Sequence, residues 1–117
     1  MSRLSREEPR HLRYVRVQHG GSVRLIPVDD VIYFKAQDKY TLVITREGES
    51  LIRKAVKDLA LELDPERFWQ IHRGTIVNVQ SIERVSRSMT GKGIVRLKDR
   101  SEPLAVSNRY MHLFRQM

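Results

Sequence analysis

Short alternations of apolar and polar residues, separated by turn-forming residues, constrain the fold of this chain more than any other feature of its sequence. The first alternation lies at residues 12–17, the Gly20-Gly21 pair that follows tolerates positive φ, and the pattern resumes at residues 23–25. Similar short runs, rich in β-branched and aromatic residues, lie at residues 31–34, 40–45, 50–53, 68–72, 75–79, 82–85, 94–97 and 103–106. The sequence therefore predicts a mainly β, mostly antiparallel fold whose core includes the aromatic residues Tyr14, Tyr33, Phe34 and Phe68.

Only two segments have the features of helices, and both are short. In the first, apolar residues recur at intervals of four, three and four residues before a proline ends the pattern: Ile52, Val56, Leu59, Leu63 and Pro65. In the second, the Ser107 hydroxyl can cap a helix whose inner face carries Tyr110, Leu113 and Phe114. The segments at residues 35–39 and 88–93 are too polar or too rich in glycine to bury, so we expect them to project as loops.

The length and the first residues of the chain indicate how it is divided. A chain of 117 residues is long enough for one core but too short for two independent ones. Residues 1–11 are polar, contain Pro9 and show no apolar period, so we expect a linker or flexible N-terminal arm there and one domain at residues 12–117. No apolar run is long enough to cross a bilayer and no signal peptide is recognisable, so we expect a cytoplasmic chain that does not enter a membrane.

The residue types that enzymes and metal sites need do not cluster in this sequence. Cysteine is absent, which excludes disulfides, thiolate metal ligands and a cysteine nucleophile. The four histidines are scattered, with none at the i, i+4 spacing of a helical zinc site. The adjacent carboxylates Asp29 and Asp30 fit a turn better than a catalytic pair. We therefore expect a protein that is not an enzyme, without a catalytic residue, a bound metal or a cofactor.

The positive charges are more informative than the chemistry of any cluster. Lysine and arginine number 22 against 14 acidic residues, and this formal net charge of +8 favours a polyanionic partner. Several cations fall in expected loops or at element ends, where their side chains can reach outward: Lys35, Lys39, Arg73, Arg87, Lys92 and Arg109. Protection of exposed strand edges would also explain lysines there. Arg73 fits that explanation least, because it leaves a buried strand at a tight turn before Gly74, where a guanidinium can grip a phosphate or read a guanine edge.

Four stretches of the chain resemble one known family. The run from Phe68 through Trp69-Gln70-Ile71-His72-Arg73-Gly74-Thr75-Ile76-Val77 to Asn78, followed by Ile82, resembles the signature of LytTR domains. These are the DNA-binding domains of LytR/AgrA/AlgR-type response regulators. Residues 31–36 with Tyr40, residues 51–63 and residues 104–107 before a final helix agree with the family in order and spacing, so that the resemblance covers residue 12 to the end.

This resemblance implies a fold and a way of binding. The fold is an elongated antiparallel β fold of LytTR type with short helices at its side, and its loops, rather than a recognition helix, enter successive major grooves of DNA. By position in the family pattern, the first contact is Gln37-Asp38-Lys39-Tyr40, the second is His72-Arg73 and the third is Ser107-Asn108-Arg109. Family members often carry arginine directly after the serine, where this chain has Asn108. Either Asn108 pairs with an adenine edge, or Arg109 takes over the contact.

The other residues of the pattern receive supporting roles. We assign Phe68, Ile71, Val77 and Ile82 to core packing, and Asn78 to hydrogen bonding within a turn. Lys35, Arg87 and Lys92 are expected to contact phosphates and so to position the domain, while Lys39, Arg73 and Asn108 or Arg109 read bases.

The expected partner is double-stranded DNA carrying adjacent repeats, on which two copies of the chain can form a homodimer. A receiver domain is expected upstream in a full-length two-component response regulator, of which this chain is the effector domain for transcription. Two alternatives stay open at this point. A module for RNA or single-stranded nucleic acid would expose aromatic rings on an open sheet face, and a protein-interaction module would have basic loops without affinity for DNA.

Overall fold

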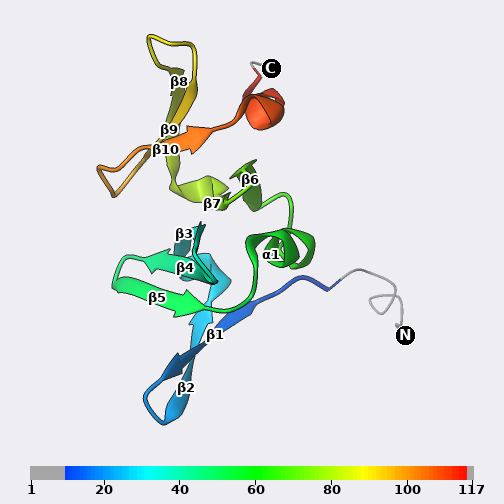
Figure 1. Cartoon of the computed structure of the whole chain (residues 1–117), viewed down its shortest axis with the longest axis vertical. Helices are drawn as coiled ribbons and strands as arrows, with labels where there is room; N and C mark the ends of the chain where they lie inside the picture. Colours follow the sequence, from blue (N-terminus) through cyan, green and yellow to red (C-terminus); the bar gives the residue numbers. More distant parts are fainter. Residues whose placement is uncertain (1–9, 116–117) are drawn as a thin grey trace.

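The computed structural model describes residues 10–115, and the strands in this range form three antiparallel sheets. The central sheet has five strands in the order β5-β4-β3-β7-β6, namely β3 (Val31–Gln37), β4 (Tyr40–Thr45), β5 (Gly48–Ile52), β6 (Phe68–His72) and β7 (Thr75–Asn78). A hairpin of β1 (Tyr14–His19) and β2 (Ser22–Pro27) lies below it in Figure 1, and β8 (Ile82–Arg87), β9 (Gly93–Leu97) and β10 (Leu104–Val106) lie above it. The predicted mainly β, antiparallel fold with short helices is confirmed.

Both faces of the central sheet are covered. Neighbouring residues of one strand belong to different apolar clusters: Phe34 packs with the β1–β2 hairpin and α1 (Val56–Glu62), whereas Tyr33 packs with the upper sheet and the 3₁₀ helix η4 (Asn108–Phe114). The same change of side separates Ile76 from Val77 in β7. The molecule is therefore three layers deep around β3 and β7, with dimensions of 49 × 41 × 24 Å.

Two β-bulges, one in β3 and one in β6, help to bury the apolar residues of these strands on both faces of the sheet. In β3 the register with β4 shifts between Val31 and Tyr33, and both Ile32 and Tyr33 then face the second cluster. All four residues from Val31 to Phe34 are consequently buried. In β6 the register with β7 shifts between Gln70 and His72, and the intervening Ile71 is completely buried. A bulge inserts one extra residue into a strand, so two consecutive residues can face the same side of the sheet.

The core residues assigned from the sequence are largely confirmed. Phe68, Ile71 and Val77 are buried, and Ile82 is half-buried against the second cluster. The Asn78 side chain is also buried, where its Nδ2 donates a hydrogen bond to the Val31 carbonyl at 2.9 Å and its Oδ1 accepts one from the Gln80 backbone N–H at 3.0 Å. Asn78 thus fixes η3 (Val79–Ser81) to the start of β3, as its assignment to a turn predicts.

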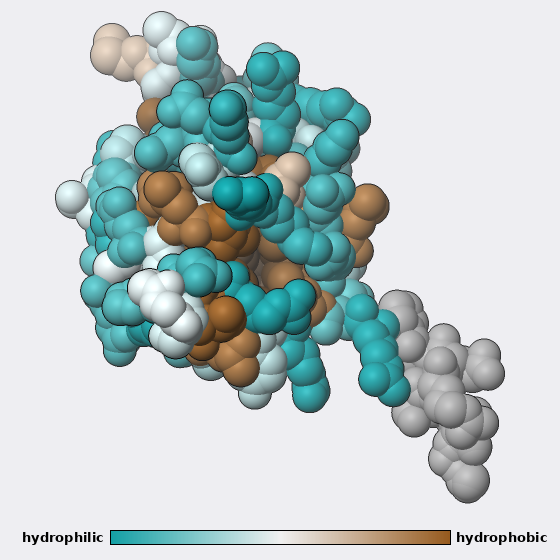
Figure 2. Space-filling view, turned by 60° about the horizontal axis from the view of Figure 1, so that its bottom comes forward, coloured by the Kyte–Doolittle hydropathy of each residue, from teal (hydrophilic) through white to brown (hydrophobic). Residues whose placement is uncertain are grey.

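Tyr14 was wrongly assigned to the core. Its side chain is 51% exposed, because the inward positions of β1 are taken by Val15 and Val17. On the same hairpin, Val23 and Leu25 of β2 are each 57% exposed. Figure 2 turns the bottom of the molecule forward and shows apolar side chains near the middle of this face, with hydrophilic side chains around them.

The segment at residues 35–39 is not the loop that its polarity predicts. Strand β3 continues to Gln37 and leaves a turn of only Asp38 and Lys39. Lys35 is opposite Leu42 of β4 and Thr75 of β7, so its backbone is paired on both sides while its side chain stays exposed. The polarity of a side chain therefore did not end the strand, because strand pairing depends on the backbone.

The two predicted helices exist but differ from their predicted form. Helix α1 begins at Val56, since Ile52 still pairs with Thr41 in the sheet. The last helix is a 3₁₀ helix, and the Ser107 side chain makes no capping hydrogen bond. The Ser107 carbonyl instead accepts from the Tyr110 N–H at 2.9 Å. The arm predicted at residues 1–11 lies, up to residue 9, outside the described residues.

Candidate nucleic-acid interface

The first two predicted contacts lie at the same end of the central sheet, which we call the turn end. Strand β3 runs antiparallel to both β4 and β7, so the β3–β4 turn at Asp38-Lys39 and the β6–β7 turn at Arg73-Gly74 are neighbours. A backbone hydrogen bond of 2.8 Å from the Ala36 N–H to the Gly74 carbonyl links them directly. Segments separated by about thirty-five residues along the chain thus present one surface.

The β3–β4 turn is narrow and presents its side chains outward. Gln37 is opposite Tyr40, and Asp38 adopts a left-handed backbone with φ of 55°. Aspartate tolerates this conformation better than most residues because its short polar side chain can bond locally. Lys39 is exposed and the Tyr40 ring is 40% exposed. All three residues of this predicted contact that follow Gln37 can therefore reach a ligand.

The β6–β7 turn holds the backbone of Arg73 and leaves its side chain free. The Gly74 N–H donates to Nδ1 of the half-buried His72 at 3.2 Å, and the Gln70 side chain donates to the Arg73 carbonyl at 3.4 Å. A Cβ on Gly74 would lie 3.4 Å from Ala36 Cβ, so the two turns approach each other closely. His72 shapes this turn, while Arg73 displays its guanidinium to solvent.

The third predicted contact is attached to the second. The Ser107 N–H donates to the Ile71 carbonyl at 2.9 Å, which places the start of η4 beside the end of β6. Asn108 and Arg109 are both exposed. The Arg109 guanidinium carbon lies 5.7 Å from the centre of the Tyr110 ring, within the range of a cation–π interaction. Either residue of the pair can therefore reach a partner, and the geometry leaves both alternatives open.

The β8–β9 hairpin extends this surface beyond η4. Gly93 is opposite Arg87 in β8 and opposite Val106 in β10, so the loop end of the hairpin lies next to the third contact. Arg87 and Lys92 are exposed at its tip, where Arg87 Nη1 donates to the Gly91 carbonyl at 3.2 Å. The close packing of η4 here requires Gly93, since a Cβ at this position would overlap with Met111 Sδ and lie 3.1 Å from Val106 Cβ.

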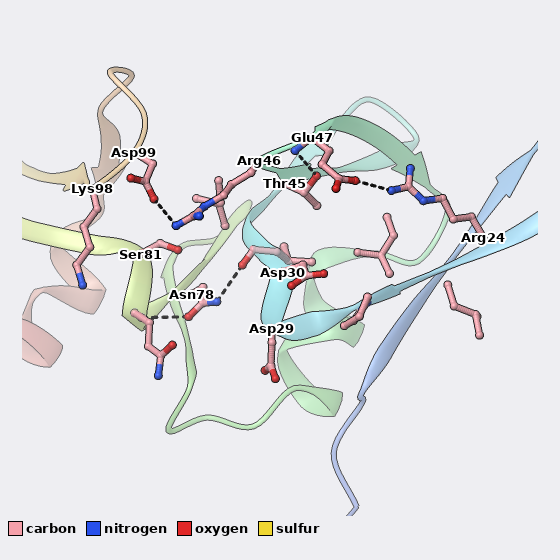
Figure 3. A pocket seen from close by; sticks show the side chains of 16 residues that line it. Arg24, Asp29, Asp30, Thr45, Arg46, Glu47, Asn78, Ser81, Lys98 and Asp99 are labelled. Atoms are coloured by element: carbon pink, nitrogen blue, oxygen red, sulfur yellow. Dashed lines mark hydrogen bonds and ion pairs between the residues drawn. The ribbon is translucent and has the colours of Figure 1, made fainter.

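The predicted cations differ in their ion pairing from the arginines at the opposite end of the central sheet. At the turn end and on its extension, the predicted cations form no salt bridge with any described residue: Lys35, Lys39, Arg73, Arg87, Lys92 and Arg109. At the opposite end the arginines are paired with carboxylates: Arg24 with Glu47 at 2.9 Å, Arg46 with Asp99 at 2.8 Å, and Arg67 with Asp29. Figure 3 shows the first two of these pairs around a pocket at that end, with Asp29 and Asp30 at the start of β3.

Arg53 is a candidate that sequence reasoning missed. It directly follows Ile52, which pairs with Thr41, so Arg53 lies beside Tyr40 at the turn end. It is exposed and, within residues 10–115, has no carboxylate partner. The signal that selected the other cations, a basic residue at the end of a predicted strand, also applies to Arg53 and could have identified it.

A separate polar cluster holds the β9–β10 loop on the central sheet. The Tyr33 hydroxyl donates to Glu102 Oε2 at 3.0 Å, and Arg100 pairs with the same oxygen. Burial, with the bond to Glu102, raises the pKa of Tyr33 to about 12. Burial alone would raise the pKa of Glu102, but hydrogen bonds from Arg100, its own backbone and Tyr33 lower it overall. These groups have a structural role and lie outside the predicted contacts.

In residues 10–115, no three acidic or histidine side chains come together as a metal site would require. No helix in the same range has the length and apolar character needed to span a bilayer.

Comparison with known proteins gives consistent matches. A family model described as "LytTr DNA-binding domain" matches residues 21–117. A response regulatory protein of Vibrio cholerae is 38% identical over 112 residues, which are 92% of this chain and 42% of that protein. The positive alginate biosynthesis regulatory protein of Pseudomonas aeruginosa is 37% identical over 90 residues, 76% of this chain and 36% of that protein. The transcriptional regulatory protein YpdB of Escherichia coli is 30% identical over 91 residues, 78% of this chain and 37% of that protein.

The chain thus spans about two-fifths of the length of these curated relatives. Among solved structures, the LytTr DNA-binding domain of a Bacillus cereus protein superimposes with a TM-score of 0.77 at 24% identity. The match covers 88% of this chain and 94% of the solved one. It confirms that the arrangement of sheets described above is the fold of that domain.

Proposed function

Because the chain belongs to the LytTr DNA-binding domain family, we propose that it binds double-stranded DNA at specific sequences and regulates transcription through its turn end. The observation that carries this proposal is the group of unpaired cations at the turn end and on its extension. The cations at the turn end and on its extension have no carboxylate partner among the described residues, whereas the arginines at the opposite end are paired. Unpaired cations on one surface are what a phosphate backbone requires of its partner.

The proposed contacts divide into base reading and phosphate binding. Asp38, Lys39 and Tyr40 on the first turn, and His72 and Arg73 on the second, enter the major groove. Each is carried by a two-residue hairpin turn, an element narrow enough for a groove about 12 Å wide. The longest dimension of the molecule is 49 Å and one helical turn of DNA is roughly 34 Å, so a domain of this size can lie along successive major grooves.

The third base contact comes from the start of η4, at Ser107, Asn108 and Arg109. Asn108 would read adenine and Arg109 would read guanine, because these are the bases whose edges match an amide and a guanidinium. Replacing each residue with alanine distinguishes the two roles. The variant that loses discrimination at one base pair of the site carries the contact, and the other variant changes affinity equally on all sequences.

Phosphate contacts would hold the domain in register. We assign them to Lys35 on β3 and to Arg87 and Lys92 on the β8–β9 hairpin, and we add Arg53 at the end of β5. Affinity should fall linearly with the logarithm of salt concentration, with a slope of about −0.9 for each phosphate neutralised. Arg53→Ala should reduce that slope by about one unit without changing sequence preference. A slope that stays at the wild-type value would remove Arg53 from the set.

The decisive experiment compares Arg73 with a matched arginine at the opposite end. A binding site is first selected from random duplex DNA, and affinities are measured by fluorescence anisotropy. Arg73→Ala should weaken binding to the selected site by about 1–3 kcal/mol and binding to random DNA far less. Arg46→Ala is the control, because Arg46 is exposed but pairs with Asp99. Its affinity should stay close to that of the wild type.

Two outcomes of this experiment would contradict the proposal. If Arg73→Ala weakens binding equally on both DNAs, Arg73 anchors a phosphate and reads no base. If Arg46→Ala is as harmful as Arg73→Ala, the turn end is not the binding surface. Competition with single-stranded DNA and RNA tests the alternative of a module for RNA or single-stranded nucleic acid. The two aromatic rings with large exposure, Tyr14 and Tyr40, lie on different sheets and form no stacking row, so duplex DNA should be preferred.

The rest of the assembly follows from the family. We propose that residues 12–117 form one DNA-binding domain, that two copies bind adjacent repeats as a homodimer on DNA, and that a receiver domain lies upstream in a full-length cytoplasmic response regulator. The relatives from Vibrio cholerae and Pseudomonas aeruginosa support this, since their names describe response regulatory and biosynthesis regulatory proteins. Footprinting on DNA with one repeat and with two repeats tests the stoichiometry.

A further inference from the structure

The tip of the β8–β9 hairpin carries an apolar side chain that the major-groove contacts do not use. We propose that Met89 is a wedge that enters the minor groove beside the outermost major-groove contact and partly unstacks one base step there. This inference rests on the proposed binding of duplex DNA and adds a second kind of contact to it. Proteins that bind the minor groove often insert an apolar side chain between base pairs, and methionine is among the residues they use.

The hairpin tip holds Met89 in a fixed position. Its backbone closes a turn in which the Gly91 N–H donates to the Ser88 carbonyl at 2.9 Å and the Ser88 N–H donates to the Lys92 carbonyl at 2.8 Å. The Ser88 hydroxyl also accepts from the Lys92 N–H at 3.2 Å and lies 2.9 Å from the Thr90 hydroxyl. Gly91 takes the left-handed backbone, with φ of 86°, that closes the loop. Met89 therefore lies within a well-bonded turn, and little backbone entropy has to be lost when it inserts.

Exposure and charge distinguish this methionine from other exposed apolar residues. Single apolar side chains on a surface are common, and Leu61 of α1 is 84% exposed. The Met89 side chain is more exposed still, at 104%, and so adds nothing to the folded core. Residues 87–92 contain two cations, Arg87 and Lys92, and no acidic residue. Along the chain, the apolar residue thus lies between two groups able to bind phosphates.

The position of the hairpin places Met89 at the edge of the proposed interface. The last strand pair before its loop adjoins the third contact, since Gly93 pairs with both Arg87 and Val106, directly before Ser107. In Figure 1 the hairpin projects from the end of the molecule opposite to the β1–β2 hairpin. A domain whose η4 occupies a major groove would therefore bring this tip to the DNA outside that groove, where the next accessible feature is the minor groove.

The test uses the full chain and a duplex selected by the wild-type protein. Single adenines along the flank of that duplex are replaced by 2-aminopurine, whose fluorescence rises when it is unstacked. Wild type should increase the fluorescence at one flanking step. Met89→Ser should abolish the increase and weaken binding roughly three- to tenfold, because the apolar contact is lost. Met89→Leu should retain both, since leucine is also a suitable wedge.

Controls and contrary outcomes separate this inference from the function on which it rests. Leu61→Ser, which removes an exposed apolar side chain away from the hairpin, should change neither fluorescence nor affinity. If Met89→Ser behaves like wild type, the wedge is refuted while DNA binding stands. If Met89→Leu loses as much as Met89→Ser, apolar insertion is also refuted. If wild type binds no selected duplex better than random DNA, the proposed function itself fails.

Discussion

Replacement of Gly93 by alanine tests how the third contact is held in place. Gly93 lies in β9 between β8 and β10, and η4 packs onto it. A Cβ here would overlap with Met111 Sδ of η4 and lie 3.1 Å from Val106 Cβ. One added methyl group should therefore displace η4, which carries both Asn108 and Arg109, and so link the stability of the fold to DNA binding.

The loss of stability caused by Gly93→Ala depends on which neighbouring side chains can move. Met111 is half-buried, and methionine is flexible, so its sulfur can move aside at low cost. Val106 is buried and lies in β10 directly opposite Gly93, so its Cβ can shift only if the strand shifts. Overpacking of a well-packed core costs about 1–3 kcal/mol. Because one of the two neighbours can yield, we expect Gly93→Ala to lower the free energy of unfolding by about 1–2 kcal/mol.

Urea denaturation of four proteins measures this directly: wild type, Gly93→Ala, Met111→Ala and the double variant. The double variant should lose about 1 kcal/mol less than the sum of the single changes, because removal of the sulfur makes room for the new methyl group. Gly21→Ala is the matched control. A Cβ on Gly21 meets no atom within 4 Å, so its effect should stay within about 0.5 kcal/mol. The same variants are then titrated with the selected duplex, to which Gly93→Ala should bind more weakly.

Additivity of Gly93→Ala and Met111→Ala would refute the argument, because residues that compete for one space must couple. A Gly93→Ala protein as stable as Gly21→Ala would refute it as well. If Gly93→Ala loses stability but keeps the full affinity for the selected duplex, η4 does not carry the third contact.

Three further predictions follow from single residues. Asn78→Ala should lower the free energy of unfolding by about 1–3 kcal/mol in urea denaturation, because it leaves the buried Val31 carbonyl without its donor. Thermal melting should show that stability falls as pH rises from 10 towards 12. The raised pKa of Tyr33 means that the folded state holds the hydroxyl proton more tightly than the unfolded state does. Tyr33→Phe should remove this dependence on pH. Asp38→Gly should raise the melting temperature or leave it unchanged, because glycine adopts a φ of 55° without strain. If this variant binds the selected duplex more weakly, the Asp38 carboxylate takes part in binding.

Local patterns in the sequence were sufficient to predict most of the strands. Strand β6 has the predicted bounds Phe68–His72, and the hairpin at Gly20-Gly21 was also predicted, because alternation and glycine act over a few residues. Lys35 shows where this reasoning fails. Its polarity predicts a loop, yet pairing with two other strands extends β3 through it. The assignment of Tyr14 to the core fails for a related reason, since only the packed structure decides which side of a hairpin faces the core.

The candidate site was harder to predict from the sequence than the strands were. Each basic residue could be found from its place at the end of an element, but nothing local brings Lys39, Arg73 and Asn108 together. That arrangement comes from the pairing of β3 with β7 and from the bond between Ser107 and Ile71, both of which join distant parts of the chain. The family resemblance supplied the grouping because it carries the fold as a whole.

The unpaired cations at the turn end also affect the molecule before it touches DNA. Unpaired positive charge at the turn end, and ion pairs without net charge at the opposite end, give the domain an uneven distribution of charge along β3, which acts as a dipole. In the field of a DNA duplex such a dipole experiences a torque that rotates the turn end towards the phosphates during diffusion. A larger fraction of encounters then begins in a productive orientation, and the association rate should fall steeply as salt screens the field.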